Sequence, residues 1–269
     1  MILKLDWAPV FTKNDYDILR NAAKDENLAV PIPDKGKGAV ILDRCNCVQE
    51  MNAILNDPTK FTKIGDPDLY NTTKPEDKIN RFLRTLKQNK TGSSYGIMSG
   101  LPKIHKEGIP LRRILSSINA SRYKLAKLLV PLLQPLTNNR YTLTNSATFK
   151  EDPDLFMASF DVESLFTNFP AAEAIDIILN KLFPSDNSLV NHFNKTQLKS
   201  LLELAVQDTA FIFDGTLFSQ IEGIAMGSPL GPNFAVIFMN SLEEPAIGRC
   251  PSDSRPPLFY KWSPSWRLF

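Results

Sequence analysis

Residues 159–170 read SFDVESLFTNFP, and they place one carboxylate, Asp161, between Phe160 and Val162 in an apolar stretch. An ionised Asp in such surroundings is unfavourable unless a partner compensates the charge. The residues before it, LFMAS at 155–159, have the composition of a short buried strand that ends at Asp161. The compensating partner is therefore a local helix cap, an ion pair or a metal ion.

Two interpretations of Asp161 follow from its place at a strand end. A carboxylate there has its backbone fixed by the sheet while its oxygens face a cleft, which is how many nucleotidyl-transferring enzymes hold Mg²⁺. Alternatively, Asp161 caps the short turn VESLF by accepting backbone N–H bonds. The residues of this stretch alone leave both interpretations open.

Composition limits the class of protein. The chain has 269 residues of which 43% are apolar, so we expect a folded protein of one or two domains. No apolar run reaches about 18 residues and no signal peptide is evident, which predicts a soluble intracellular protein, nuclear or cytoplasmic, without a membrane partner. The three cysteines suit a reducing compartment, and with only two histidines a zinc site is disfavoured.

Charge is distributed unevenly along the chain. Between Lys74 and Lys127 there are 13 Lys or Arg and three acids, a local charge of +10, which leaves −8 for the remainder because the whole chain carries +2. A basic block beside an acidic remainder is typical of a phosphate-binding region next to a cation-binding one. A pair of solvated basic helices explains the same charges equally well.

Apolar periodicity predicts seven helices. In the third, Ile79, Phe82, Leu83 and Leu86 recur on one face and should pack inward. Its cations should then lie outside, where they can bind nucleic acid: Lys78, Arg81, Arg84 and Lys87. The predicted helices span residues 15–24, 46–55, 75–89, 120–134 with Pro131 interrupting, 171–182, 196–207 and 233–242, the last ended by Pro245.

Turn residues predict three hairpins. The clearest is AFIFDGTLFSQ at 210–220, where Asp-Gly between two strand-like runs is the preferred two-residue turn. The runs NLAVPIP and GAVILD, at 27–33 and 38–43, flank DKGKG, with Asp34 and Lys35 at the tip. Residues 91–119 are expected to be irregular apart from a hairpin that turns at Glu107-Gly108.

Two further stretches suit a phosphate ligand. In LPKIHKEGIPLRRI, at 101–114, Lys103 and Arg112 flank a glycine turn and could clamp a triphosphate, Lys as a point charge and Arg as a fork. Exposed hairpin charges are the simpler alternative. The glycines of IEGIAMGSPLGP, at 221–232, allow close approach to a ligand, although their spacing matches neither a P-loop nor a dinucleotide fingerprint.

Taken in order, these stretches resemble the reverse transcriptase domain of Penelope-like retroelements. The resemblance is carried by PDKGKGAVILDR, GLPKIHKEGIPLRRILSSIN, SFDVESLFTNFP and AMGSPLGPNFAVIFM, and it spans residues 18–244. It implies an α/β (α+β) right-hand polymerase: fingers at 1–150 and a partial palm with an antiparallel sheet at 151–269. The implied activity is RNA-directed DNA synthesis with an RNA template, a DNA primer, deoxynucleoside triphosphates and two Mg²⁺ ions.

The resemblance also implies a role for individual residues. Asp161 would ligate both Mg²⁺ ions, with the carbonyl of Val162 completing one coordination shell. Phe166 would exclude the 2′-hydroxyl of the incoming nucleotide, and Met226 and Gly227 would line the nucleotide site. Lys103 and Arg112 would bind its triphosphate.

The chain departs from the family at its third palm motif. Tyr-x-Asp-Asp should follow PPLFYK, but residues 254–269 contain no Asp or Glu. One carboxylate cannot fix two Mg²⁺ ions, so we expect these residues to form a truncated polymerase domain that is inactive by itself. GIMS, at 96–99, resembles an insertion. The alternative function is a non-catalytic nucleic-acid-binding remnant that uses the basic fingers.

Overall fold

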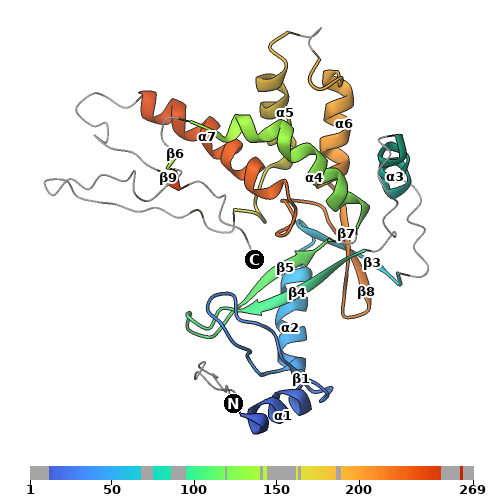
Figure 1. Cartoon of the computed structure of the whole chain (residues 1–269), viewed down its shortest axis with the longest axis vertical. Helices are drawn as coiled ribbons and strands as arrows, with labels where there is room; N and C mark the ends of the chain where they lie inside the picture. The colour runs from blue at the N-terminus through green and yellow to red at the C-terminus, as the bar shows by residue number, and fades with distance from the viewer. Residues whose placement is uncertain are drawn as a thin grey trace, which may run out of the picture. The chain divides into compact units, whose positions relative to one another are not determined.

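The computed structural model describes residues 12–67, 75–85, 95–118, 120–139, 142–143, 162, 165–185, 189–249 and 261–262. The chain divides into two compact units (Figure 1). We name them the sheet unit, Met1–Asn71 with Tyr95–Ser116 and Ala210–Ile221, and the helical unit, Thr72–Ser94 with Ser117–Thr209 and Glu222–Phe269. Each unit combines segments that are distant in sequence. The assignment of 1–150 to fingers and 151–269 to a partial palm remains a prediction.

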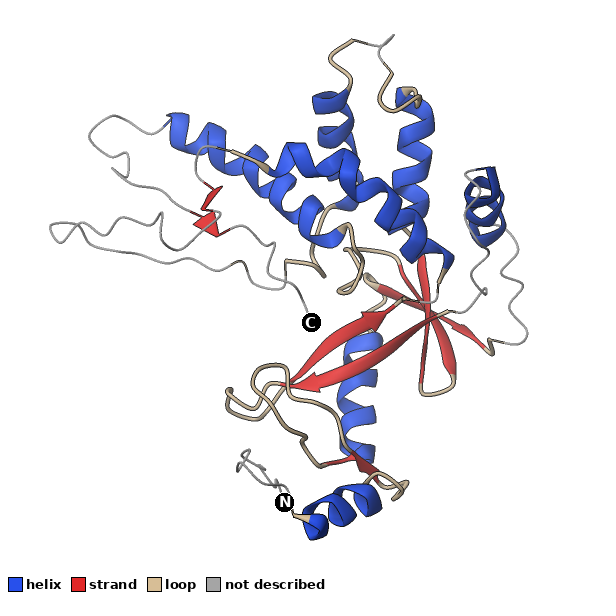
Figure 2. Cartoon of the chain, in the orientation of Figure 1, coloured by secondary structure: helices blue, strands red, loops and turns tan. Residues whose placement is uncertain are grey.

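The sheet unit is built on a five-stranded sheet in the order β3-β8-β7-β4-β5. The sheet is mixed, because β4 pairs antiparallel with β5 but parallel with β7, where Gly96 lies opposite Phe211. The predicted mixed α/β fold class is therefore confirmed. The strands of this sheet come from both of the predicted ranges, 1–150 and 151–269. The strands are β3 Phe61–Gly65, β4 Gly96–Pro102, β5 Leu111–Ser116, β7 Thr209–Phe213 and β8 Thr216–Gln220 (Figure 2).

The predicted β7–β8 hairpin is confirmed, including its turn. Asp214 and Gly215 both have positive φ, 44° and 74°, as a turn that follows the strand twist requires. Behind this turn the rings of Phe211 and Phe218 stack with centroids 5.8 Å apart, and Phe61 of β3 meets Phe211 edge-on at 6.0 Å. Aromatic packing thus joins three of the five strands.

The N-terminal segments complete the sheet unit. Helix α1, Lys13–Ala22, begins with a capping box between Thr12 and Asp15. The first predicted hairpin is confirmed as the antiparallel pair β1 Leu28–Ala29 and β2 Leu42–Asp43. Helix α2, Arg44–Leu55, buries Met51 and Leu55. The Met51 sulfur lies so near β4 that a Cβ on Gly100 would stand 3.2 Å from it.

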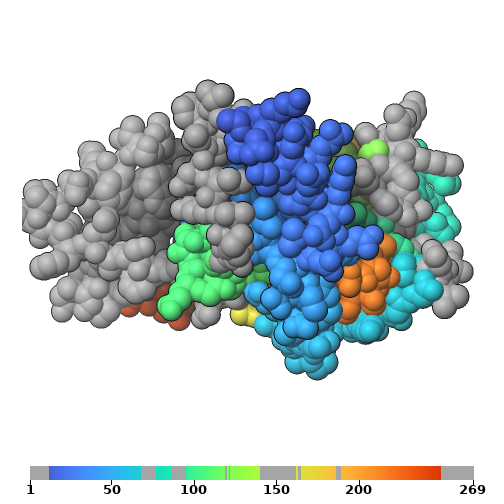
Figure 3. Space-filling model, turned by 90° about the horizontal axis from the view of Figure 1, so that it is seen from below, coloured from blue at the N-terminus to red at the C-terminus, as the bar shows by residue number. Residues whose placement is uncertain are grey.

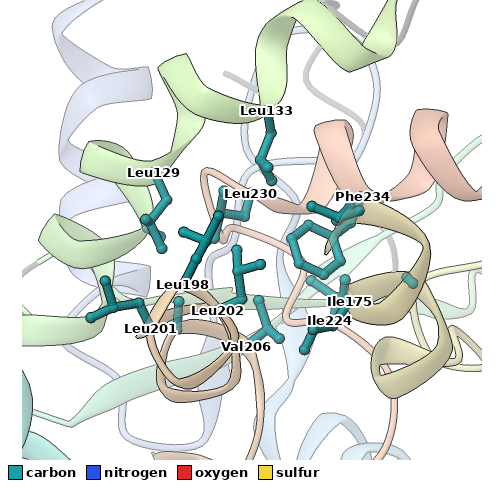
Figure 4. Packing of buried hydrophobic residues seen from close by; sticks show 14 of the residues in the cluster. Leu129, Leu133, Ile175, Leu198, Leu201, Leu202, Val206, Ile224, Leu230 and Phe234 are labelled. Atoms are coloured by element: carbon teal, nitrogen blue, oxygen red, sulfur yellow. The ribbon is translucent and has the colours of Figure 1, made fainter. Parts of the chain in front are cut away.

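In the part of the helical unit that the structure describes, buried apolar side chains form one cluster. Leu129 and Leu133 from α4, Ile175 from α5, four residues of α6 and Phe234 of α7 point into it (Figure 4). The elements are α3 Pro75–Thr85, α4 Ser121–Leu133, the 3-10 turn η1 Gln134–Thr137, α5 Ala171–Leu182, α6 Lys195–Val206 and α7 Gly231–Arg249. A parallel pair, β6 Thr142–Leu143 and β9 Lys261–Trp262, is also present.

Most predicted helices are confirmed to within a few residues, but three predictions are wrong. Pro131 does not interrupt its helix, because α4 continues through it to Leu133 and the exposed site lets water satisfy the carbonyl that loses its N–H partner. Pro245 does not end α7, which continues to Arg249. Pro245 is exposed, so water can satisfy the carbonyl that loses its N–H partner. Residues 96–99 are not irregular, since they form the first half of β4, which pairs with both neighbouring strands, while the interpretation of GIMS as an insertion stays a prediction.

None of the helices in the described ranges is long and apolar enough to cross a membrane.

Candidate functional site

The β4–β5 hairpin brings Lys103 and Arg112 together. Lys103 follows the end of β4, and its N–H donates to the carbonyl of Pro110 at 3.0 Å. Arg112 is the second residue of β5 and lies opposite Leu101. The loop between the strands turns through Gly108, whose φ is +71°. The two cations therefore lie on the two arms of the hairpin, near the loop that joins β4 to β5.

Arg112 is held by an ion pair from a distant part of the sequence. Its Nε lies 3.0 Å from Oδ1 of Asp34, whose side chain is only 5% exposed whereas that of Arg112 is 34% exposed. The backbone N–H of Asp34 donates to the carbonyl of Pro102, also at 3.0 Å. Figure 3 shows the blue N-terminal segments beside the green β4–β5 loop. Asp34 therefore lies against the hairpin instead of projecting from the tip of its own.

The charges around Lys103 are mostly of its own sign. Burial lowers the pKa of Lys103, and the positive charges of Arg112 and Lys106 lower it further, while Asp34 acts in the opposite direction. Lys103 is thus a partly desolvated cation beside other cations. An anion with several charges would relieve this repulsion, which is the electrostatic property expected of a phosphate site.

The neighbouring Arg113 belongs to a different environment. It lies opposite Gly100 on the face that carries Met98 and Leu115, and its guanidinium carbon is 5.8 Å from the centre of the Phe61 ring. Burial lowers the pKa of Arg113, and the nearby Asp57 opposes that shift. Because side chains alternate along a strand, the adjacent arginines serve different faces.

In the helical unit, Phe166 packs against the start of α7. Its carbonyl accepts the N–H of Ile224 at 2.8 Å. A Cβ on Gly231 would stand 3.2 Å from Cε1 of the Phe166 ring, closer than ordinary contact. Because Gly231 has no side chain, the Phe166 ring can pack directly on α7. This contact joins the stretch SFDVESLFTNFP to the stretch AMGSPLGPNFAVIFM.

The loop before α7 places Gly227 at a sharp turn. Gly227 is exposed and has φ +126°, a conformation that side-chain-bearing residues rarely adopt, while Met226 beside it is half-buried. The N–H of Ser228 donates to the carbonyl of Ala225 at 3.0 Å and closes the turn. An exposed glycine backbone is available to a ligand at this point.

The cations of α3 lie outside, as the periodicity predicts. Lys78, Arg81 and Arg84 are exposed, whereas Ile79 and Leu83 are buried. The predicted position Lys87 lies outside the described residues. We name Lys78, Arg81 and Arg84 the α3 stripe.

Arg122 also belongs to the basic block but has another role. It is 7% exposed, and its guanidinium donates to the carbonyls of Leu204, at 2.9 Å, and Gln207 at the C-terminal end of α6. It satisfies helix carbonyls that would otherwise lack donors. Sequence counting placed Arg122 with the phosphate-binding cations because a buried helix end leaves no local sequence signal.

The metal-binding prediction is not tested by the described geometry, because Asp161 lies outside the described residues. Its neighbour Val162 is described and is 46% exposed. Within the described ranges, no three His, Cys, Asp or Glu side chains are grouped as metal ligands would be. The assignment of Mg²⁺ to Asp161 and Val162 therefore stays a prediction.

Two residues near the cation pair were missed by the sequence reasoning. Asp34 was placed only at the tip of a hairpin, and Glu50 of α2 was not singled out, yet Oε1 of Glu50 accepts the N–H of Leu111 at 2.8 Å. Both contacts join segments more than 60 residues apart, so local periodicity could not reveal them. The only available signal in the sequence was that Asp34 lies in PDKGKGAVILDR, one of the stretches that carry the family resemblance.

No protein-family model matches the chain, and no curated protein matches it.

Proposed function

We propose that this chain forms the fingers and part of the palm of an RNA-directed DNA polymerase. The observation that carries the proposal is the cation pair of Lys103 and Arg112. The two lie nine residues apart in a hairpin and repel each other, and Arg112 is held by a buried carboxylate from another of the stretches that carry the family resemblance. Such an arrangement favours a ligand with several adjacent negative charges, and a nucleoside triphosphate is one.

The corner in the helical unit supports the same proposal. Phe166, the proposed 2′-hydroxyl gate, has its carbonyl and its ring both fixed by the segment that carries Gly227. A gate must be held rigidly to discriminate a single hydroxyl group. Asp161 and the carbonyl of Val162 would hold Mg²⁺, which when bound neutralises charge on the phosphates of the reacting nucleotide.

Nucleotide binding tests the cation pair. We expect the 269-residue chain to bind dTTP, measured by calorimetry, and Arg112→Ala to weaken binding by about tenfold through loss of a charged hydrogen-bonding fork. Arg44→Ala is the matched control, because Arg44 also pairs with a carboxylate of the sheet unit, Asp214 at 3.4 Å, but on an exposed site. Equal affinities for the wild type and Arg112→Ala would contradict the proposal.

Primer extension tests the separate expectation about catalysis. One candidate carboxylate cannot fix two Mg²⁺ ions, so the 269-residue chain alone should extend a DNA primer on an RNA template no better than Asp161→Ala does. Extension that depends on Asp161 would show that other carboxylates of this chain complete the metal site.

A second candidate function is non-catalytic binding of nucleic acid, which the exposed α3 stripe favours. Reversing Lys78, Arg81 and Arg84 to Glu should weaken binding to an RNA–DNA hybrid and reduce its dependence on salt. Reversing three exposed cations of the N-terminal region, Lys13, Arg20 and Lys24, is the control for net charge. Equal losses from the two triple variants would rule out a role specific to the α3 stripe.

A further inference from the structure

Asp34 is bound to the hairpin through both its backbone and its side chain. The N–H bond to Pro102 fixes the position of its Cα at the end of β4, and Oδ1 forms an ion pair with Nε of Arg112. Because the Asp34 side chain is 95% buried, few other positions are open to the carboxylate. The direction from which it meets Arg112 is therefore fixed by backbone geometry.

The contact uses one end of the guanidinium. Arginine carries five N–H donors in a rigid plane, so a carboxylate on Nε sets the orientation of the plane while the far edge can still receive a second anion. The Arg112 side chain is one-third exposed, so that edge can be reached from solvent. A lysine at this position could not be oriented in the same way.

The second oxygen of Asp34 is the unusual feature. Oδ2 is buried and has no hydrogen-bond partner among the described residues. Burying a carboxylate oxygen without a hydrogen-bond donor costs free energy. An ion pair that only held two loops together would be expected to give that oxygen a donor. The same carboxylate acts on Lys103 by attraction, which places it near both cations of the pair.

We propose that Asp34 is a positioning residue for the triphosphate site, holding the guanidinium of Arg112 at the angle in which its far edge and Lys103 meet adjacent phosphates. The inference rests on the proposed function, since it takes Lys103 and Arg112 as triphosphate ligands. It adds that the buried carboxylate of DKGKG keeps two cations together when no nucleotide is bound. Its negative charge lowers the mutual repulsion of the cations, and its fixed geometry prepares Arg112.

The direction in which Asp34→Asn changes anion affinity distinguishes a positioning role from a purely electrostatic one. Asp34→Asn removes a negative charge beside an anion site, so by charge alone it should strengthen anion binding. If Asp34 positions Arg112, the same substitution should weaken binding because the guanidinium loses its fixed orientation. We expect Asp34→Asn to bind tripolyphosphate about five- to tenfold more weakly than the wild-type 269-residue chain, measured by calorimetry.

A double-mutant cycle tests whether the effect passes through Arg112. Asp34→Asn should cause no further loss in an Arg112→Ala background, whereas damage to the fold would add to the loss. Asp214→Asn is the matched control, because Asp214 also accepts an ion pair from an arginine, Arg44, and lies in a turn that suits Asn. It should change tripolyphosphate affinity by less than about twofold.

The outcomes distinguish failure of the inference from failure of the function. Equal or tighter binding by Asp34→Asn, with Arg112→Ala still weaker than wild type, would overturn the positioning role and leave the proposed function intact. Absence of tripolyphosphate binding by the wild type, or no effect of Arg112→Ala, would overturn both. If thermal denaturation shows that Asp34→Asn does not fold, Arg112→Lys is tested instead, because lysine keeps the positive charge but lacks the Nε group that pairs with Asp34. Unchanged tripolyphosphate affinity of Arg112→Lys would overturn the inference.

Discussion

The two units hold their candidate residues by different means. In the sheet unit, Lys103 and Arg112 are placed by a buried carboxylate and by backbone hydrogen bonds. In the helical unit, Phe166 is placed by the contact of its ring with a helix that has no side chain at Gly231. Substitutions in the helical unit should therefore act on stability through volume, and those in the sheet unit on ligand binding through charge and orientation.

The largest effect is expected at a fully buried aromatic ring of the helical unit. Phe234 is fully buried, and its ring meets Phe169 edge-on at 6.3 Å. Phe234→Ala should lower the free energy of unfolding by about 3–5 kcal/mol, measured by urea denaturation. Leu242→Ala on the same helix, where the side chain is 50% exposed, should change it by less than about 0.5 kcal/mol. Similar losses would mean that α7 is not anchored by its buried face.

A charged residue tests whether volume alone governs the helical unit. Arg122→Met keeps much of the side-chain volume but removes the donors to the carbonyls of Leu204 and Gln207. We expect a loss of about 2–4 kcal/mol in the free energy of unfolding, because two helix-end carbonyls lose a charged donor. Lys127→Met on the exposed side of α4 is the control. A neutral result for Arg122→Met would show that the carbonyls find other donors.

Two glycines of α7 should respond with opposite signs. Gly231→Ala places a Cβ 3.2 Å from the Phe166 ring and should destabilise the chain by about 1 kcal/mol. Gly248→Ala meets nothing within 4 Å and should stabilise by about 0.5–1 kcal/mol through helix propensity. Thermal denaturation of both variants measures the difference. Stabilisation by both would show that the Phe166 ring moves aside readily, which would weaken its assignment as a rigid gate.

The smallest effect concerns the charge of Lys103. Burial and neighbouring cations lower its pKa from the ordinary value of 10.5, so it loses its proton at a lower pH than an exposed lysine. The protonated form binds tripolyphosphate more tightly, and affinity should fall by about two- to threefold as pH rises through that lowered pKa. Lys103→Arg, which stays charged, should show a flatter pH dependence in the same calorimetric titration. Parallel pH profiles would exclude Lys103 as a ligand.

The elements that the sequence predicted well are those with local causes. Asp214-Gly215 could be assigned because a two-residue turn with positive φ favours those residues, and α5 because its apolar positions repeat with the helix period. Strand β3 and the first half of β4 were missed, since FTKIG and GIMS have no clear alternation and are defined by partners far along the chain.

The candidate sites show the same division. Lys103 and Arg112 could be paired from sequence because they flank one turn, and the outward face of α3 could be read from its periodicity. The carboxylate of Asp34, the burial of Arg122 and the contact of Phe166 with Gly231 depend on long-range packing. Sequence reasoning named the candidate residues but could not say which contacts hold them in place.

The parallel pairing of β4 with β7 has a consequence for synthesis on the ribosome. Residues 96–102 emerge long before residues 209–213, the strand that covers that edge of β4. At roughly 5–20 residues per second, the interval is on the order of 5–20 s, during which the backbone at Gly96 and Ile97 lacks its final neighbour. Nascent chains of this protein should therefore depend on chaperones until the second strand is made.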